Sequence, residues 1–237
     1  MNAVKKIIAT GLLASVAGLA HAIPTDLVDL KDDGGNTLFN DIAPGEYTDT
    51  GAAYAELIDT DSAIDNATAF LIFEFAGFDS RNSFGIYDMN LFDPNAASSN
   101  NILEVFTGTD SPIKSRSLEF DLAAGTVSVG STTAEIGRYF GFYLERDGKR
   151  FYSDATMNAN NEDMALIYDV HGYSGDTEIL GSQLLVAFED VLGGDNDFND
   201  LVVGINDVKA VPEPGTLALF GLGLAGLGLA ARRRKQA

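Results

Sequence analysis

The sequence predicts a mainly β protein: an antiparallel β-sandwich of the jelly-roll type, with an N-terminal signal helix and a single C-terminal transmembrane helix. Short apolar or alternating runs recur at roughly ten-residue spacing through the middle of the chain, which is typical of sandwiches and jelly rolls. No long amphipathic helical pattern interrupts them, and long apolar runs occur only at the two ends. We therefore expect a signal peptide (1–22), an irregular acidic segment (23–66), a β domain (67–209) and a C-terminal anchor (211–237).

The N-terminus has the three parts of a secretory signal peptide. Lys5 and Lys6 precede an apolar run over residues 7–20, and the run closes with Ala20-His21-Ala22. A basic start, a short apolar stretch and a small-x-small end are what signal peptidase recognises, which assigns Ala20 and Ala22 to the cleavage site. The run is short for a membrane span and acidic residues soon follow it. A plain N-terminal anchor is the alternative.

The segment between the two ends, residues 23–211, is strongly acidic. It holds 34 of the 35 acidic residues and 9 of the 15 basic residues, so its net charge is −25. This charge argues against nucleic acid and anionic lipid as partners, because both need basic patches, and it favours cations. The chain has no cysteine, so an exported domain of this size must be held together by core burial or by metal.

Residues 23–66 are acidic, Gly-rich and weakly periodic, and we expect an irregular segment with a strand or two and a short helix near Ala52–Ile58. Thr68–Phe75 is almost continuously apolar, as expected of a strand buried on both faces. Arg138–Glu145 alternates, and Asp147-Gly148 is a type I′ turn signal that leads into a return strand. The same criteria predict strands at Asn82–Met89, Ser117–Leu122, 127–129, Arg150–Ser153, Ala165–His171, Ser182–Glu189 and Leu201–Asp207.

The most acidic stretch, residues 189–200, lies between two predicted strands. It carries five carboxylates and two amides in twelve residues. Their mutual repulsion would be costly without a cation or backbone donors, and hard oxygen ligands of this kind suit Ca²⁺. We predict a calcium site with the candidate ligands Glu189, Asp190, Asp195, Asp197, Asn199 and Asp200.

This stretch is not an EF-hand. Asp195, Asp197 and Asn199 match positions 1, 3 and 5 of such a loop, but Asp200 replaces the sixth-position glycine and Asn206 stands where the bidentate glutamate should be. The alternative to calcium is an Asx-rich turn, in which Asp and Asn side chains cap backbone N–H groups.

Catalytic constellations are unsupported. After signal removal the only histidine is His171 and there is no cysteine, so Ser-His-Asp, Cys-His and His-rich zinc sites are all unsupported. A glycosidase needs only two carboxylates, and 34 acids always provide a pair, so their number does not argue for an enzyme. Tyr139, Tyr143 and Tyr152 form either a sugar-stacking face or ordinary strand surface. We expect a protein without enzymatic activity.

The C-terminus combines three features in a fixed order. Val211-Pro212-Glu213-Pro214 resists helix formation, seventeen apolar or small residues follow over 215–231, and a basic cluster ends the chain. As a helix the run is about 26 Å long, enough for a thin bilayer, with the basic cluster on the cytoplasmic side. A simple tail anchor with an incidental Pro-Glu-Pro is the alternative. The residues that carry the pattern are Val211, Pro212, Glu213, Pro214, Arg232, Arg233 and Arg234.

This end resembles the PEP-CTERM sorting signal, which the membrane protease exosortase recognises. The resemblance implies export by the secretion machinery of a Gram-negative bacterium. It also implies an intermediate held in the inner membrane by the C-terminal helix, followed by processing and delivery to the cell surface or the extracellular space.

A second resemblance concerns the middle of the chain. Segments 76–78, 82–88, 140–143 and 188–203 are similar to a domain of unknown function that recurs on PEP-CTERM proteins, over about residues 67–205. It implies an extracellular β-rich domain and no reaction. Together these observations predict a non-catalytic, Ca²⁺-stabilised binding or structural module associated with exopolysaccharide. The alternatives are a secreted polysaccharide-acting hydrolase and a homotypic adhesin.

Overall fold

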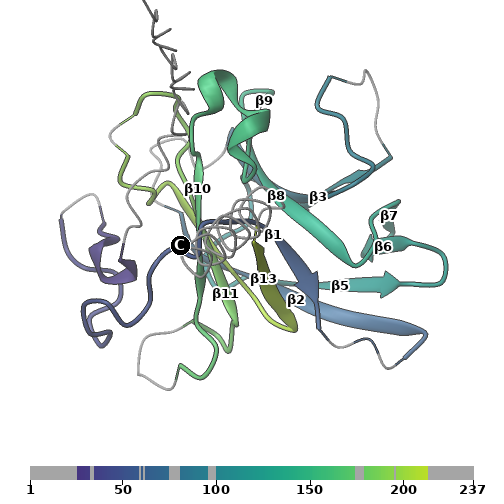
Figure 1. Cartoon of the computed structure of the whole chain (residues 1–237), viewed down its shortest axis with the longest axis horizontal. Coiled ribbons are helices and arrows are strands. Elements are labelled where there is room, and N and C mark those ends of the chain that lie inside the picture. The colour runs from purple at the N-terminus through teal and green to yellow at the C-terminus, as the bar shows by residue number, and fades with distance from the viewer. Residues whose placement is uncertain are drawn as a thin grey trace, which may run out of the picture.

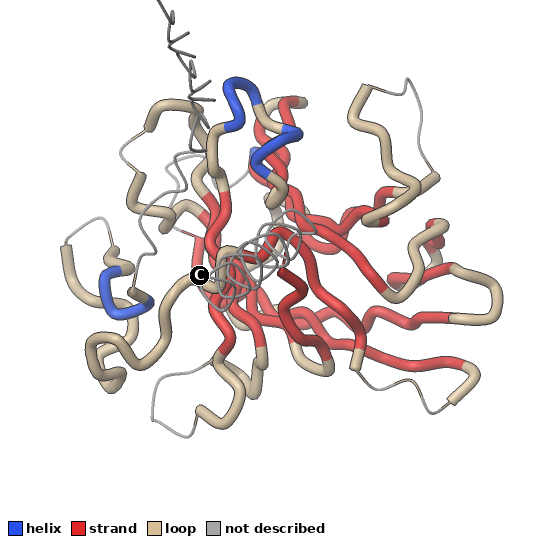
Figure 2. Tube along the Cα trace, viewed as in Figure 1, coloured by secondary structure: helices blue, strands red, loops and turns tan. Residues whose placement is uncertain are grey.

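The computed structural model describes residues 26–32, 35–58, 60, 62–74, 81–95, 100–173, 179–194 and 196–212. Two antiparallel sheets face each other, and Figure 2 shows that strands dominate while the helical elements are short turns at the periphery. These turns are the 3₁₀ elements η1 (Leu27–Asp29), η3 (Ala155–Met157) and η4 (Ala159–Asn161). The predicted mainly β, sandwich-like architecture is thereby confirmed for the described residues.

The first sheet has six strands. Its order is β13 (Val208–Pro212), β1 (Ala52–Leu57), β8 (Tyr139–Arg146), β3 (Asn82–Asp88) and β4 (Ile102–Phe106), and β9 (Lys149–Tyr152) pairs with the second half of β8. Figure 1 shows β13 beside β1 near the centre of the molecule.

The second sheet has seven strands. Its order is β10 (Ala165–Asp169), β11 (Leu184–Phe188), β12 (Leu201–Ile205), β2 (Ile64–Glu74), β5 (Ser115–Asp121), β6 (Thr126–Val129) and β7 (Thr132–Ala134). The chain crosses between the sheets six times, at β1–β2, β2–β3, β4–β5, β7–β8, β9–β10 and β12–β13. Each sheet therefore contains strands from both halves of the chain.

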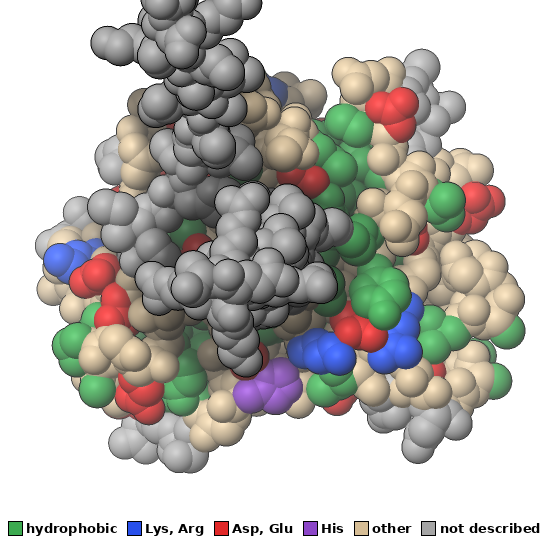
Figure 3. Space-filling view, in the orientation of Figure 1, with side chains coloured by type: hydrophobic (Ala, Val, Ile, Leu, Met, Phe, Trp, Pro, Cys, Tyr) green, Lys and Arg blue, Asp and Glu red, His purple; other side chains and the backbone are tan. Residues whose placement is uncertain are grey.

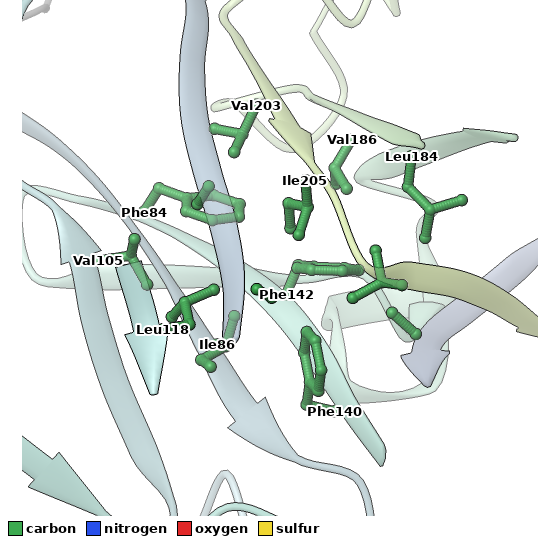
Figure 4. Close-up of a cluster of buried hydrophobic side chains, with 14 of the residues drawn as sticks. Phe84, Ile86, Val105, Leu118, Phe140, Phe142, Leu184, Val186, Val203 and Ile205 are labelled. Carbon is green, nitrogen blue, oxygen red and sulfur yellow. The ribbon is translucent and has the colours of Figure 1, made fainter. Parts of the chain in front are cut away.

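The main core lies between the two sheets. Figure 4 shows Phe84, Ile86, Phe140 and Phe142 of the six-stranded sheet close to aliphatic side chains of the other sheet. Burial of such large apolar side chains is the dominant stabilising term for a domain without disulfides. The aliphatic partners labelled there include Leu118, Leu184, Val186, Val203 and Ile205.

A second core covers the outer face of the seven-stranded sheet. Leu27, Leu30, Phe39 and Ile42, all buried, pack there against residues of β2, β10, β11 and β12. This layer explains the continuous apolar run of β2, which is buried on both faces as predicted. The segment before residue 67 thus contributes core side chains.

The helix predicted near Ala52–Ile58 is wrong, because these residues form β1. Alanine and glutamate favour helix, but β1 pairs with β13 on one side and with β8 on the other, and its residues are buried. Tertiary pairing therefore overrides the local preference. The nine predicted strands coincide with β2, β3, β5, β6, β8, β9, β10, β11 and β12, and the structure adds β1, β4, β7 and β13.

The predicted turn between β8 and β9 is confirmed. Asp147 and Gly148 both have positive φ, of 51° and 77°, as a type I′ turn requires. The predicted signal peptide (1–22) lies outside the described residues, and so do Glu213, Pro214 and the apolar run with its basic tail (215–235). Within the described part of the chain, no helix combines the length and apolar character that a membrane span requires.

Two glycines make room for tyrosine rings on the outer face of the six-stranded sheet. Gly85 of β3 is paired with Tyr143 of β8, and Tyr87 of β3 is paired with Gly141 of β8. A Cβ added at position 85 would lie 2.4 Å from the Tyr143 ring, and one at position 141 would lie 2.3 Å from the Tyr87 ring. Each glycine therefore leaves the space that the tyrosine of the neighbouring strand occupies.

Candidate functional site

The predicted calcium ligands lie in the connection between β11 and β12, residues 189–200, which we call the acidic loop. Phe188 and Leu201, at the two ends of this loop, are paired residues of neighbouring antiparallel strands. The loop therefore leaves and re-enters the seven-stranded sheet at the same point, and its carboxylates are confined to one end of the sandwich.

Asp190 ties the base of the acidic loop to the opposite sheet. Its carboxylate is buried and accepts hydrogen bonds from the guanidinium of Arg146 (2.6 Å) and the side-chain amide of Asn82 (3.2 Å). Arg146 ends β8 and Asn82 begins β3. A carboxylate this far from water needs a compensating charge, and Arg146, with a side chain only 16% exposed, supplies it.

Two glutamates flank the first half of the acidic loop. Glu189 is buried, and its Oε1 would lie 2.1 Å from a Cβ added at position 194, so this position accommodates only glycine without displacement of the carboxylate. Glu162, in the segment before β10, accepts a hydrogen bond from the backbone N–H of Gly193 through its Oε1. The loop is therefore held from outside as well as at its base.

The second half of the acidic loop is fixed to the N-terminal segment. Phe198 is buried in the second core, and the side-chain amide of Asn199 donates to the carbonyl of Lys31 (2.7 Å) and to the carboxylate of Asp197 (2.8 Å). Asn196 and Phe198 both have positive φ, of 59° and 52°. Non-glycine residues in this region are strained, so surrounding contacts must maintain the loop conformation.

Hydrogen bonds of the kind that the capping interpretation predicts are present in the loop. Asp200 accepts from the backbone N–H of Asp190 at 2.7 Å, and Asp197 accepts from the backbone N–H of Asn199 at 3.4 Å. Asp195 lies outside the described residues. Among the residues that are described, no group of three or more acidic, histidine or cysteine side chains is arranged to hold a metal ion.

Three participants were not predicted from the sequence: Arg146, Asn82 and Glu162. Glu162 had a usable signal, because β10 and β11 are antiparallel neighbours with Ala165 opposite Phe188. The segment before β10 must therefore lie beside the segment after β11. Arg146 and Asn82 come from the other sheet, and no local pattern in the sequence indicates which strand ends face the acidic loop.

The tyrosines proposed to stack on sugars do not form an exposed face. Tyr143 and Tyr152 are 3% and 6% exposed in an aromatic cluster that includes Tyr87 and Phe92, and only Tyr139, at 38%, reaches the surface. Burial raises the pKa of the Tyr87 and Tyr143 hydroxyls. Two of the three tyrosines that were expected to face solvent are therefore buried in this cluster.

The single histidine of the exported segment is also placed. His171 follows β10 on the surface, with its side chain 39% exposed, and its Nδ1 lies 2.7 Å from the carboxylate of Asp169. The imidazole of His171 is thus paired with a surface carboxylate two residues earlier in the chain.

The last strand, β13, is attached to β1 through a cluster of charged side chains. Lys209 of β13 contacts Glu56 of β1 at 2.9 Å, and the same carboxylate contacts Arg138 at 2.7 Å and Tyr139 at 3.0 Å. Burial alone would raise the pKa of Glu56, but the hydrogen bonds from Lys209 and Tyr139 and the charge of Arg138 outweigh it, so the pKa lies below its usual value. The ionised carboxylate therefore helps to attach β13 to β1.

Comparison with known proteins assigns two parts of the chain. A model of the PEP-CTERM protein-sorting motif matches residues 210–235, and a model of the domain of unknown function DUF4114 matches residues 128–207. No curated protein and no solved structure matches the chain. The DUF4114 match contains the acidic loop, but it begins within β6 and so excludes the 82–88 segment on which part of the resemblance was based. The chain thus carries a PEP-CTERM sorting motif that begins within the last strand of the β-sandwich, and the second half of that sandwich matches DUF4114.

Proposed function

We propose that this chain is a non-catalytic binding or structural module of the cell surface or extracellular matrix. The observation that carries the proposal is the position of the sorting motif, whose match begins at residue 210, within the last strand of the sandwich. The PEP-CTERM motif indicates an exported protein that passes through a membrane-anchored intermediate and is processed by exosortase. The sandwich is then the cargo that is delivered.

Three structural features support a role without catalysis. The only histidine of the exported segment pairs with a surface aspartate, most of the tyrosine row is buried, and Asp190 is committed to Arg146 and Asn82. The buried tyrosines and Asp190 serve the fold. A hydrolase acting on polysaccharide is the alternative, and a screen of the purified protein against glycans distinguishes the two: turnover of any glycan would contradict the proposal.

Association with exopolysaccharide is the finer part of the proposal. The exported segment has a net charge of −25, and Figure 3 shows acidic side chains in several separate places on the visible face. An acidic domain is repelled by an anionic polysaccharide, so we expect its binding to a polymer of that class to require divalent cations and to weaken when they are chelated. A homotypic adhesin would instead increase in solution size with calcium in the absence of polysaccharide.

Calcium binding at the acidic loop is proposed as the stabilising element. The support is the number of carboxylates in the loop, with Glu162 and Glu189 beside its first half and Asp197 in its second. Their oxygens are the ligand type that Ca²⁺ prefers. Calcium at about 100 times its dissociation constant would add about 2.7 kcal/mol to the free energy of unfolding.

The calcium proposal has a matched control. Asp93 and Asn95 form the same Asp-x-Asn hydrogen-bonded turn as Asp197 and Asn199, but far from the acidic loop in sequence. Thermal unfolding should shift upward in millimolar Ca²⁺ for the wild type and for Asp93→Asn, and the shift should be smaller for Asp197→Asn. Equal unfolding temperatures with and without calcium would exclude a metal role for the loop.

Sorting itself is tested by the ends of the mature protein. In a host that makes exosortase, mass spectrometry of the exported protein should find the N-terminus after Ala22 and a C-terminus near Pro212–Pro214. A full-length polypeptide in the cytosol, with Met1 and Ala237 both retained, would contradict export and processing.

A further inference from the structure

We propose that β13 covers the start of the sorting motif and must separate from β1 before the chain is processed. This inference rests on the proposed function and adds a conformational requirement to it. The opening of this strand by the folded sandwich then controls release of the protein from the membrane, because exosortase recognises the motif only after the strand has opened.

The overlap between strand and motif is direct. Residues 210–212 belong both to the sorting-motif match and to β13. Ala210, Val211 and Pro212 are paired with Ala55, Tyr54 and Ala52 of β1. The first three residues of the motif are therefore part of a sheet, and they cannot enter a protease cleft as an extended strand while that pairing persists.

Little chain separates this strand from the apolar run. Only Glu213 and Pro214 stand between Pro212 and Gly215, where the seventeen-residue apolar run begins. Fully extended, three residue steps span about 10 Å. With β13 paired, at most this length of chain separates the end of the sandwich from the apolar run. Release of residues 210–212 would lengthen this tether by about 10 Å.

The structure also shows how β13 is held. Val208 is fully buried in the main core and its N–H donates to the side-chain carbonyl of Gln183 at 3.2 Å. Lys209 pairs with Glu56, and Val211 packs against the aromatic cluster. These contacts hold the first part of the strand more firmly than its end.

Two features make β13 the strand best suited to open. It is an edge strand, with β1 as its hydrogen-bonded neighbour in the sheet order. Its register with β1 shifts between Ala52 and Tyr54, opposite Pro212 and Val211. Edge strands with irregular pairing open at low cost compared with the core. Opening from Pro212 backwards would expose the motif while the main core stays packed.

A disulfide lock tests the requirement, since the chain has no cysteine of its own. Ala55 and Ala210 are paired residues on adjacent antiparallel strands and both pack on the main core, so Ala55→Cys with Ala210→Cys can join β1 to β13 at the first residue of the motif match and leaves the Lys209–Glu56 ion pair intact. The control is Glu145→Cys with Arg150→Cys, which joins another pair of opposed residues, on β8 and β9. Each full-length variant is followed by pulse-chase and mass spectrometry in a host that makes exosortase.

The oxidised β1–β13 lock should slow loss of the C-terminal tail by about tenfold or more, and reductant should restore the wild-type rate. The β8–β9 lock and the single substitutions should leave the rate within about twofold. As a second arm, Lys209→Ala removes the ion pair without a crosslink and should quicken processing by about threefold, a typical range for one exposed ion pair.

The outcomes separate the two proposals. Processing of the oxidised β1–β13 lock at the wild-type rate, or slower processing of Lys209→Ala, overturns the requirement for β13 opening while sorting by exosortase stands. A wild-type chain that keeps Ala237 in this host overturns the proposed function, and this inference with it.

Discussion

Gly141→Ala should be among the most damaging conservative substitutions in this protein. The added Cβ would lie 2.3 Å from Cζ and 2.4 Å from Oη of Tyr87, far inside van der Waals contact. The ring cannot move outward freely, because Tyr87 is fully buried and packs edge-on against Tyr152 at 5.6 Å and close to Phe92 at 5.0 Å. Either the aromatic cluster or the pairing of β3 with β8 must give way.

The magnitude follows from two opposing effects. Overpacking a rigid site costs about 1–3 kcal/mol, and a contact of 2.3 Å with a buried ring belongs at the upper end. Alanine in place of glycine recovers about 0.5–1 kcal/mol of chain entropy and strand preference. We therefore expect a net loss of about 2 kcal/mol in the free energy of unfolding, which corresponds to a melting temperature about 4–8 °C lower for a domain of this size.

The assay is urea unfolding of polypeptide 23–212, with Gly137→Ala as control. A Cβ at position 137 would meet only a carboxylate oxygen of Asp88 at 3.6 Å, an ordinary contact, so that variant should stay within about 0.5 kcal/mol of wild type. Tyr87→Leu should cost less in the Gly141→Ala background than alone, because the two positions share one space. Wild-type stability of Gly141→Ala would refute the reasoning.

Three further expectations concern charge and packing. Asp190→Asn should lower stability by about 2–4 kcal/mol, since it leaves Arg146 without its buried partner, whereas Glu145→Gln at an exposed pair should cost less than 1 kcal/mol; denaturant titration measures both. The pKa of Glu56 is lowered in the folded state, so its contribution is present above the unfolded carboxyl pKa of about 4.3 and is lost as pH falls through the lower folded value. Glu56→Gln should accordingly be about 1 kcal/mol less stable at neutral pH and match wild type below the folded pKa. Phe198→Ala should cost about 3 kcal/mol by emptying part of the second core, and unchanged unfolding would contradict its anchoring role.

Local patterns predict the strands that have an amphipathic or wholly apolar signature, such as β2, β5 and β8, and they predict the type I′ turn. They miss β1, whose alanines and glutamate favour helix until β8 and β13 pair with it. They miss β13 because its residues occur at the junction with a recognisable sorting signal. Pairing between distant segments decides both strands, and a single sequence does not encode such pairing locally.

The same limit applies to the acidic loop. The sequence predicts its position between two strands and its concentration of oxygen ligands. It does not predict that Asp190 would bond to Arg146 and Asn82 of the opposite sheet, because that contact depends on how the two sheets are stacked. The contact of Glu162 is only partly predictable. Its proximity to Gly193 can be inferred once β10 and β11 are recognised as neighbouring strands.

The folding unit of this protein is larger than the region that matches a known domain. The DUF4114 match covers residues 128–207, yet β8 within it pairs with β1 and β3, and β12 pairs with β2, all outside the match. Polypeptide 128–207 would lose β1 and β3 beside β8, β2 beside β12, and the part of the main core that includes Phe84.

We therefore expect polypeptide 128–207 to remain unfolded, with narrow amide dispersion in its NMR spectrum and no cooperative unfolding transition, whereas polypeptide 23–212 should unfold in one cooperative step. The physical reason is that polypeptide 128–207 would expose strand edges and apolar faces that the rest of the sandwich covers in the longer polypeptide. A dispersed spectrum and a cooperative transition for 128–207 alone would show that the second half forms an autonomous sheet. In that case β1, β2 and β3 would be additions to a pre-existing domain, and the crossing of the chain between the two sheets would no longer explain its stability.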